Sequence, residues 1–468
     1  MLQGRFFRRL VELRTRYERA PELPFAEALQ AASIQAILEE LKVEFRERIY
    51  TPLVTLWVFV SQVLDPDPSC RQAVSRLLAH RAQRGLPPCS TDSGSYCTAR
   101  KKLPEALLQR LVQKTGLELQ QQAPAEWDFH GRKVKLADGT TVSMPDTAEN
   151  TAAFDKPRNQ RGPGPFPVAR VLVLLALATG AALEAAIGPC RGKKTGELSL
   201  FRTLHHTLEP GDLVLADRLF CTFCDIAKLQ AQGVDCVFRL SSSRSADFRR
   251  GRRLGQDDHL VTWSKPKQCP EGMSAAEFAE LPDQLQVREV RVTVNVPGFR
   301  VKSLVVVTTL LDPLEFPPDE IAALFRQRWQ AELHLRSIKT VLQMDVLRCL
   351  TPEMVRKEIW AHLLAYNLLR SMLCAAAAES DRPLCTFSFK ASLQLLSAFR
   401  HELLSSLADD ARLRHCCDLI VHALSEHRVH DRLNRYEPRK CKRPPKPFPQ
   451  LKRPRHVERN LCRQNRSS

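Results

Sequence analysis

The sequence has no apolar run long enough to cross a membrane. Its longest apolar stretch, from Val171 to Leu183, covers 13 of the 468 residues and is bounded by Arg170 and Glu184. A membrane-spanning helix requires roughly 20 such residues, so we interpret this stretch as a buried strand. The first residues are charged throughout and contain no apolar segment typical of a secretory signal. We therefore expect a cytoplasmic protein without a membrane segment.

Acidic residues are too few to balance the basic ones. The chain has 70 Lys and Arg against 52 Asp and Glu, which leaves a net charge of +18. Such a surplus favours a polyanionic partner, nucleic acid before membrane. Half of the surplus lies between Glu437 and Ser468, where eleven Lys or Arg accompany two Glu. The repeated prolines of this segment predict an extended basic arm.

Cysteine is abundant, but a disulfide framework is not expected. Fifteen cysteines in a chain without an export signal are typical of a reduced environment. Cys221 and Cys224 form a CxxC pair, and no second Cys or His pair follows it at zinc-finger spacing. We interpret them as packing thiols. An oxidoreductase that uses a low-pKa thiol of this pair is the alternative.

Hydrophobic periodicity divides the chain into a helical part and a mixed part. Apolar residues at three- and four-residue spacing predict helices from Glu27 to about Arg84, followed by a basic helix around Arg100. From Arg132 the pattern alternates, and GRKVKLADGTTVSMPD predicts a strand, a Gly turn and a second short strand. Further along we expect a hairpin over 171–187, a helix over 197–207, a strand over 212–220, a helix over 222–232 and a strand over 234–240.

This order, β-β-β-α-β-α-β, matches a ribonuclease-H-like fold, in which helices flank a mixed sheet. The fold class we expect is therefore α/β, with a ribonuclease-H-like core, a β-rich insertion and an all-helical N-terminal domain. The predicted segments are the helical N-terminal domain (1–126), the first part of the core (127–240), the insertion (241–318), the second part of the core (319–375), and a helical C-terminal region with the basic arm (376–468).

Three acidic residues are the candidate catalytic and metal-binding groups. Asp138 is expected where the first strand meets its Gly turn, Asp217 ends the apolar strand LVLA, and Glu332 belongs to the long helix after the insertion. Phosphodiester chemistry uses divalent cations to neutralise charge and to lower the pKa of the attacking water. Oxygen donors suit Mg²⁺ or Mn²⁺. The next candidates are Asp146 or Asp155 for the first position and Asp212 or Asp225 for the second.

The helix that carries Glu332 holds the most specific pattern of the sequence. Phe325, Arg328 and Lys339 lie at offsets of −7, −4 and +7 from Glu332. On a continuous helix these positions share one face. The carboxylate could then bind a metal while Arg and Lys bind neighbouring phosphates. The alternative is an ordinary Arg–Glu ion pair on a solvated helix.

These residues resemble a known family. F-x2-R-x3-E-x6-K at 325–339 is similar to the Y-x2-R-x3-E-x6-K signature of the insertion-sequence-four family of DDE transposases. LADGTTV and LVLADRLF resemble its two Asp motifs, and CTARKKLP resembles its basic N-terminal helix. The resemblance implies that Asp138, Asp217 and Glu332 form the metal-binding triad. It also implies that Phe325, which replaces the family's Tyr, contacts DNA with Arg328 and Lys339.

The function implied by the resemblance is cut-and-paste DNA transposition in a bacterial cytoplasm, at the nucleoid. A homodimer would bind the terminal inverted repeats through the N-terminal domain, cleave by metal-activated water, and join the 3′-hydroxyl to target DNA. A hairpin intermediate is implied only by the family. The alternative is a repressor of transposition that binds DNA without chemistry.

In the insertion, Arg249 and Arg250 belong to an arginine-rich segment that we assign to DNA contact, with a solvated loop as the alternative. Trp263 either packs in a β core, which we favour, or stacks on an extruded base.

Overall fold

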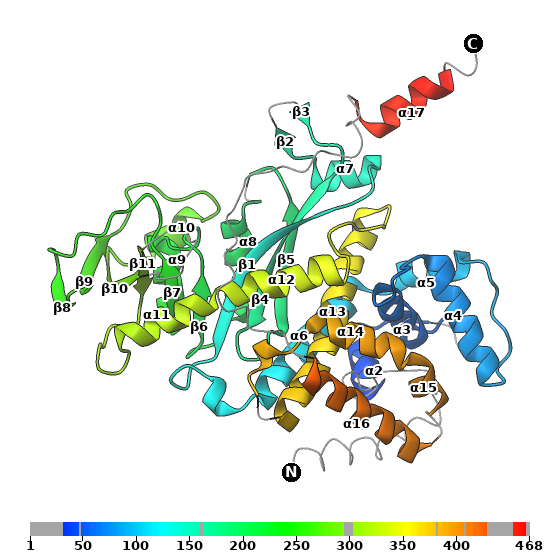
Figure 1. Ribbon diagram of the computed structural model, residues 1–468. Helices are drawn as coiled ribbons and strands as arrows, with labels where there is room; N and C mark the ends of the chain where they lie inside the picture. Colours follow the sequence, from blue (N-terminus) through cyan, green and yellow to red (C-terminus); the bar gives the residue numbers. More distant parts are fainter. Residues whose placement is uncertain are drawn as a thin grey trace.

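The computed structural model describes eight stretches of the chain. They are residues 31–45, 48–159, 162–193, 195–293, 303–380, 382–406, 409–427 and 453–464. Within them the chain has a mixed α/β fold, built around one large mixed sheet (Figure 1).

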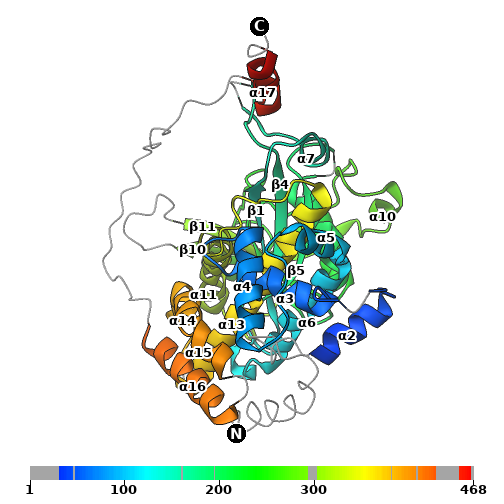
Figure 2. The same cartoon turned by 90° about the vertical axis from the view of Figure 1, so that its right-hand side faces the viewer.

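The regular elements that precede the sheet are all helical, as predicted. They are α2 (Ala31–Glu40), α3 (Pro52–Val63), α4 (Cys70–Gln83), α5 (Gly94–Lys102), α6 (Glu105–Gln122) and the short 3₁₀ helix η1 (Ala125–Trp127). Thr51 and Ser69 begin α3 and α4 as N-caps, each accepting a backbone hydrogen bond. The view in Figure 2 looks onto α3 and α4. Leu107, Leu108 and Leu111 of α6 belong to the same apolar cluster as the sheet, so this helix is part of the main core.

The predicted basic helix, α5, holds its arginine inside the fold. The Arg100 guanidinium lies 4.9 Å from the ring centroid of Phe59 and 5.4 Å from that of Tyr96. Lys101 and Lys102 are exposed. Only the two lysines are therefore available to a partner such as DNA.

Nine strands form the main sheet, in the order β5-β4-β1-β6-β7-β11-β10-β9-β8. The strands are β1 (Val134–Ser143), β4 (Val168–Ala176), β5 (Ala182–Pro189), β6 (Leu213–Ala216), β7 (Asp235–Arg239), β8 (Arg252–Gly255), β9 (Asp258–Ser264), β10 (Gln284–Thr293) and β11 (Ser303–Thr308). The neighbours β1, β6 and β7 are parallel, and the other neighbouring pairs are antiparallel. Two short strands, β2 (Arg158–Asn159) and β3 (Gly162–Pro163), pair separately.

The helices that follow β1 are distributed along the rest of the chain. They are α7 (Ala148–Phe154), α8 (Glu197–Leu204), the 3₁₀ helix η2 (His205–Thr207), α9 (Phe223–Ala231), α10 (Ala275–Ala279), α11 (Pro318–Gln327), α12 (Trp329–Arg336), the π turn η3 (Ser337–Val341), α13 (Pro352–Ser380), the 3₁₀ helix η4 (Leu384–Thr386), α14 (Phe389–Ala398), α15 (Arg400–Ser405), α16 (Asp410–Glu426) and α17 (Arg455–Gln464). The strands of the main sheet and helices α8 and α9 follow the predicted order β-β-β-α-β-α-β from β1 to β7, but α7, β2 and β3, which lie between β1 and β4, were not predicted.

One prediction for the first strands is wrong, because residues 134–143 form a single strand without a Gly turn. Asp138 and Gly139 both pair with β4 in an antiparallel ladder. A Cβ atom on Gly139 would lie 2.6 Å from Cδ of Glu197. The glycine therefore admits a neighbouring side chain against the strand backbone.

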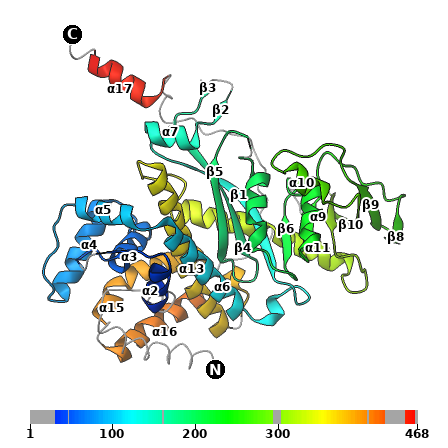
Figure 3. The same cartoon turned by 180° about the vertical axis from the view of Figure 1, so that it is seen from behind.

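The β-rich insertion predicted over 241–318 extends the main sheet. Strand β11 pairs with β7, and β10, β9 and β8 follow outward. Pro297 and Gly298, a pair that predicts a turn between two strands, lie outside the described residues. Seen from behind, β8, β9 and β10 occupy the end of the molecule opposite helices α3 to α5 (Figure 3). The insertion thus covers an edge of β7 that would otherwise be unpaired.

Apolar side chains alternate between the two faces of the sheet. Leu136 and Leu215 belong to the larger core cluster, together with residues of α6, α11, α12 and α13. Ala137 and Val214 belong to a second cluster, together with residues of α8 and α9. This alternation follows from the two-residue period of a strand. In Figure 1, α11 and α12 cross in front of the sheet.

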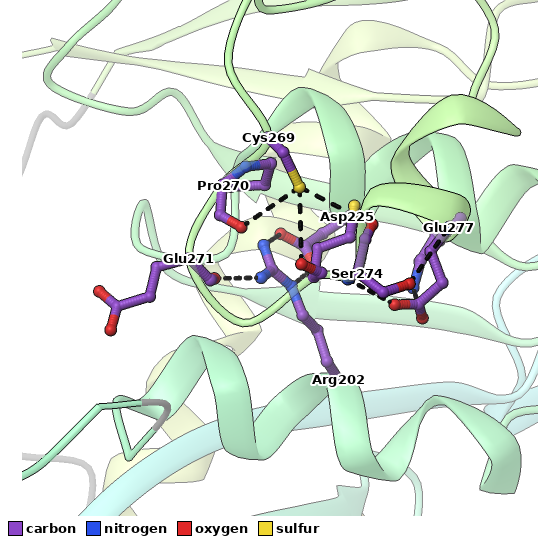
Figure 4. A network of polar contacts seen from close by, with 9 residues as sticks. Arg202, Asp225, Cys269, Pro270, Glu271, Ser274 and Glu277 are labelled. Atoms are coloured by element: carbon purple, nitrogen blue, oxygen red, sulfur yellow. Dashed lines mark hydrogen bonds and ion pairs between the residues drawn. The ribbon is translucent and has the colours of Figure 1, made fainter.

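A buried polar network anchors α9 on the second face (Figure 4). Arg202 of α8 donates from Nε and Nη2 to the two carboxylate oxygens of Asp225, at 2.7 and 2.9 Å. Its Nη1 donates to the carbonyl of Glu271 at 2.8 Å. Both paired side chains are buried, so Asp225 is committed to holding α8, α9 and the following loop together.

The basic C-terminal segment is only partly described. Residues 428–452 lie outside the described part, and residues 455–464 form α17 rather than an extended arm. The N–H of Arg455 donates to Oδ2 of Asp146 at 3.3 Å. None of the described helices is both long and apolar enough to cross a membrane.

Candidate active site

Strand register places the two aspartates on neighbouring strands. Ala137 of β1 pairs in parallel with Ala216 of β6, and Asp138 and Asp217 follow directly. Neighbouring strands lie roughly 4.8 Å apart. Leu136, two positions before Asp138 on β1, belongs to the larger core cluster, so the alternation of side chains places the Asp138 carboxylate on the face covered by α12. Asp217 lies one residue beyond the end of β6.

Asp138 occupies a partly buried and electrostatically crowded position. Burial raises the pKa of its carboxyl to about 6. The N–H of Gly139, which donates to Oδ1 at 2.9 Å, and the charge of Arg328 oppose this shift. The charges of Glu332 and Glu197 add to it. Asp138 and Glu332 therefore act on each other electrostatically, within one site.

Glu332 lies on a helix that is interrupted on both sides. The long helix predicted over 319–344 is present from Pro318 to Val341, but it is not regular: one turn tightens at Arg328, whose backbone stays in the α region, and the π turn η3 follows α12. At the first break the N–H of Arg328 donates to the carbonyl of Phe325 at 3.1 Å, an i→i−3 bond. Interruptions of this kind often occur at functional positions.

Arg328 and Glu332 form an ion pair, which is the alternative that the sequence offers to metal and phosphate binding. Nη2 of Arg328 lies 2.9 Å from Oε1 of Glu332, and their side chains are 18% and 39% exposed. This pair differs from a solvated surface pair, because Arg328 also lowers the pKa of Asp138. The charge of Arg328 thus acts on the carboxylates of both Glu332 and Asp138.

The common face expected for the signature does not include Phe325. Its side chain is buried in the larger core cluster, so its predicted place on a DNA-contacting surface is wrong for this conformation. Lys339 belongs to the π turn, where the rotation per residue differs from that of an α-helix. It is half-buried and forms no ion pair with the described residues. The cation is therefore free to bind an anion.

The oxygen donors fit a hard divalent cation, although they do not converge. The described residues contain no group of three or more His, Cys, Asp or Glu side chains that could hold a metal ion. The Asp217 carboxylate has no hydrogen-bond or ion-pair partner within the described stretches, and burial disfavours the charge of Asp138. A cation would stabilise both groups.

The other candidate acids are engaged elsewhere. Asp146 pairs with Lys156 at 2.7 Å, Asp155 with Arg191 at 3.6 Å, Asp212 with Lys135 at 2.6 Å and Asp225 with Arg202 at 2.7 Å. Asp138 and Asp217 remain the best-placed pair.

Comparison with known proteins agrees with this arrangement. Residues 129–368, which include all three acids, match the family model described as "Transposase DDE domain". The chain belongs to the DDE transposase family. It is 27% identical to the transposase InsG for insertion sequence element IS4 of Escherichia coli K12, over 78% of this chain and 80% of that protein. The family resemblance of the sequence is confirmed, and this is an IS4-type DDE transposase.

Two further likenesses are more limited. A 69-residue stretch is 35% identical to the putative transposase InsL for insertion sequence element IS186A of E. coli K12, covering 15% of this chain and 19% of that protein. The structure of a piggyBac transposase synaptic complex with hairpin DNA aligns with a TM-score of 0.43 and 11% identity, covering 86% of this chain and 84% of that one.

A fourth acid of this DDE transposase was not predicted. Glu197 begins α8, packs against the backbone of Gly139 and raises the pKa of Asp138. The only signal in the sequence was the glycine that directly follows Asp138, which was assigned to a turn. A close approach between elements distant in sequence leaves no periodic pattern.

The arginine-rich segment of the transposase presents two exposed cations. The side chains of Arg249 and Arg250 are 91% and 84% exposed, and both pair with Asp247, at 2.9 and 3.4 Å. The segment is fixed from beneath, since Phe248 stacks on His259 with 4.5 Å between ring centroids. Arg249 and Arg250 are thus held at the surface.

Trp263 takes the core role that the sequence favoured. Its side chain is buried in the second cluster, and Nε1 donates to Oε1 of Glu289 at 3.1 Å. The Arg244 guanidinium covers the ring at 4.0 Å. The ring is therefore not free to stack on a base.

The CxxC pair has the character of packing thiols. Cys221 and Cys224 are both buried in the second cluster. Burial raises the pKa of Cys221 to about 12 and also raises the pKa of Cys224. A redox role would require a lowered pKa, so the oxidoreductase alternative is not supported.

Proposed function

We propose that this protein is a cut-and-paste DNA transposase with a ribonuclease-H-like catalytic core. The strand order β5-β4-β1-β6-β7, with β1, β6 and β7 parallel, supports the fold assignment. One observation carries the function. In the parallel β1–β6 pairing Asp138 and Asp217 each directly follow the last paired residue, and Arg328 joins Glu332 to the surroundings of Asp138, which supports an acidic site at this edge of the sheet.

Asp138, Asp217 and Glu332 are the residues that would hold Mg²⁺ or Mn²⁺. When bound, such ions activate water and neutralise phosphate charge. Arg328 and Lys339 bind phosphates of the transposon end, Arg328 exchanging its ion pair with Glu332 for a phosphate. Water then nicks one strand at the transposon end, and the freed 3′-hydroxyl attacks the opposite strand in line, which forms a hairpin and releases the flanking DNA. A second water opens the hairpin and regenerates the 3′-hydroxyl, which then attacks a phosphodiester of target DNA.

The protein works as a homodimer, because paired cutting requires both terminal inverted repeats to be held together. The exposed Lys101 and Lys102 of the N-terminal helices contribute to binding of these ends. The proposal is tested by incubating a labelled transposon-end duplex with the protein and Mg²⁺. Nicking at the end, followed by a hairpin product, supports it.

A DNA-binding repressor of transposition is the second candidate. It is favoured by one observation, the absence among the described residues of three acids gathered to hold a metal ion. A gel shift of the same duplex without cleavage, in both Mg²⁺ and Mn²⁺, would support the repressor over the transposase.

Arg249 and Arg250 are expected to contribute affinity through phosphates rather than bases. Each phosphate contact adds about −0.9 to the slope of log K against log salt. Replacing both arginines with Gln should therefore flatten this slope by about 1.8 and weaken binding to all duplexes alike. Asp247→Asn, in the same segment, should have the opposite effect, because it removes their shared counter-ion. Unchanged slopes in filter-binding titrations would mean that the segment is only a solvated loop.

A further inference from the structure

Helix α12 needs a lateral anchor. It has only eight residues, with a break at Arg328 before it and the π turn after it. The first irregularity is a tightened turn, in which the backbone of Arg328 stays helical, and the π turn then changes the rotation of the residues that follow α12. The position of Glu332 therefore depends on the side contacts of α12.

His334 supplies such a contact from the buried side of α12. Its Nδ1 lies 2.9 Å from the hydroxyl of Tyr366, and that hydroxyl donates to the carbonyl of Gly180 at 2.8 Å. The single hydroxyl proton is used on the carbonyl, which can only accept. Nδ1 of His334 therefore carries a proton and donates to Tyr366, which defines a relay from α12 through α13 to the β4–β5 turn.

The β4–β5 turn, which contains Thr179 and Gly180, leaves room for the His334 side chain. Gly180 has φ +67°, and a Cβ atom there would lie 2.4 Å from Cε1 of His334. Arg370, which is buried, donates from Nε to the carbonyl of Thr179 at 2.7 Å. The imidazole, the phenol and the guanidinium thus converge on two adjacent residues of one turn.

We propose that His334 and Tyr366 are positioning residues that fix the rotation of α12 and so hold Glu332 beside Asp138. This inference rests on the proposed function. His334 follows Glu332 by two residues, about 200° around a helix. With His334 held against the turn, Glu332 lies on the far flank of the helix, toward the neighbouring carboxylates.

The hydrogen bonds from His334 to Tyr366 and from Tyr366 to Gly180 both form in only one rotation of α12. Any other rotation would leave a buried imidazole N–H without an acceptor, which is unfavourable. Groups that orient metal ligands typically change metal affinity or activity 10- to 100-fold when removed. We expect an effect of this size from a change that removes one oxygen atom, Tyr366→Phe.

The chain offers a matched control on the same helix. Asn367 donates to and accepts from the backbone of Ala182 and donates to α6, and it makes no contact with α12. Asn367→Ser therefore weakens the same junction without touching the relay. Mn²⁺ binding to each full-length variant is measured by electron paramagnetic resonance, with and without an unlabelled transposon-end duplex, beside the Tm.

Tyr366→Phe should weaken Mn²⁺ binding roughly tenfold or more, whereas Asn367→Ser should lower the Tm with little change in Mn²⁺ affinity. His334→Asn keeps an N–H near the Nδ1 position and should retain most of the affinity that His334→Leu loses. Gly180→Ala should behave like Tyr366→Phe. Gly85→Ala, at φ +64° in open space, should not.

Equal Mn²⁺ affinities of wild type and Tyr366→Phe would overturn the positioning role. So would losses of affinity that merely follow the Tm across all variants. If the wild type shows no Mn²⁺ binding that depends on Asp138, the proposed function fails, and the positioning role fails with it.

Discussion

Replacing Asp138 or Asp217 with Asn, or Glu332 with Gln, is expected to abolish strand cleavage while DNA binding survives. Each change keeps the side-chain shape and removes the charge that would hold a divalent cation. Because the three groups act as one site, each single variant should lose as much activity as the triple variant, at least roughly 10³-fold. The measurement is single-turnover cleavage of a labelled transposon-end duplex, beside a gel shift on the same DNA.

Two controls separate loss of chemistry from loss of fold. Asp319→Asn removes an exposed acid from α11 and should leave cleavage unchanged. Asp138→Asn should stabilise the apo protein at pH 7. Because the pKa is raised from 3.8 to about 6, the wild-type folded state loses stability as the pH rises from about 4 to about 6, and the full penalty is present above pH 6. At about 1.36 kcal/mol per pKa unit, reduced for partial exposure, the gain is about 2 kcal/mol at most, and it should vanish below pH 4.

A triad variant that cuts at a rate close to wild type would remove that residue from the site. Asp146, Asp155, Asp212 and Asp225 are ion-paired away from the site, so a replacement would come from Glu197, which acts on Asp138 and lies 4.0 Å from Nε of Arg170.

The strands of the site could be predicted from the sequence. The run LVLA and the alternation around Asp138 are strong local signals, although β6 covers only Leu213–Ala216 of the strand predicted over 212–220 and ends directly before Asp217. Strands β1 and β6 are parallel neighbours. The order of strands and helices along the chain favours this pairing, because connection rules allow only a few topologies for such an order.

The helix breaks could not be predicted, because no Pro or Gly marks them. The residues from 319 to 344 form an unbroken amphipathic pattern, yet the chain departs from the α-helix at Arg328 and again at Ser337. Tertiary contacts such as that of His334 outweigh local propensity here. Phe325 packs into the larger core cluster, and a spacing along one helix does not show which side of that helix faces the sheet.

The close approach of Glu197 to Gly139 was equally hidden from the sequence. A glycine after an acid in an alternating segment has two explanations, a turn or a close contact. Only the three-dimensional arrangement of α8 against β1 distinguishes them.

Arg328 is expected to be the most important cation of the site. Arg328→Gln should reduce cleavage roughly 10- to 100-fold, because a hydrogen bond to a charged group contributes about 1.5–3 kcal/mol. It should also flatten the salt dependence of transposon-end binding by about 0.9, the loss of one phosphate contact. Without this cation the pKa of Asp138 should rise further above about 6, since Arg328 is one of the groups that lower it.

Two further variants decide which property of Arg328 matters. Arg328→Lys keeps the charge but loses the planar fork that contacts a phosphate through two N–H groups, so an intermediate cleavage rate and an unchanged salt slope are expected. Arg326→Gln removes an exposed cation of α11 two residues away and should cut at the wild-type rate. If Arg328→Gln instead cleaves and binds like wild type, the ion pair at 2.9 Å is its whole role. Arg328 would then stabilise the start of α12 without touching DNA.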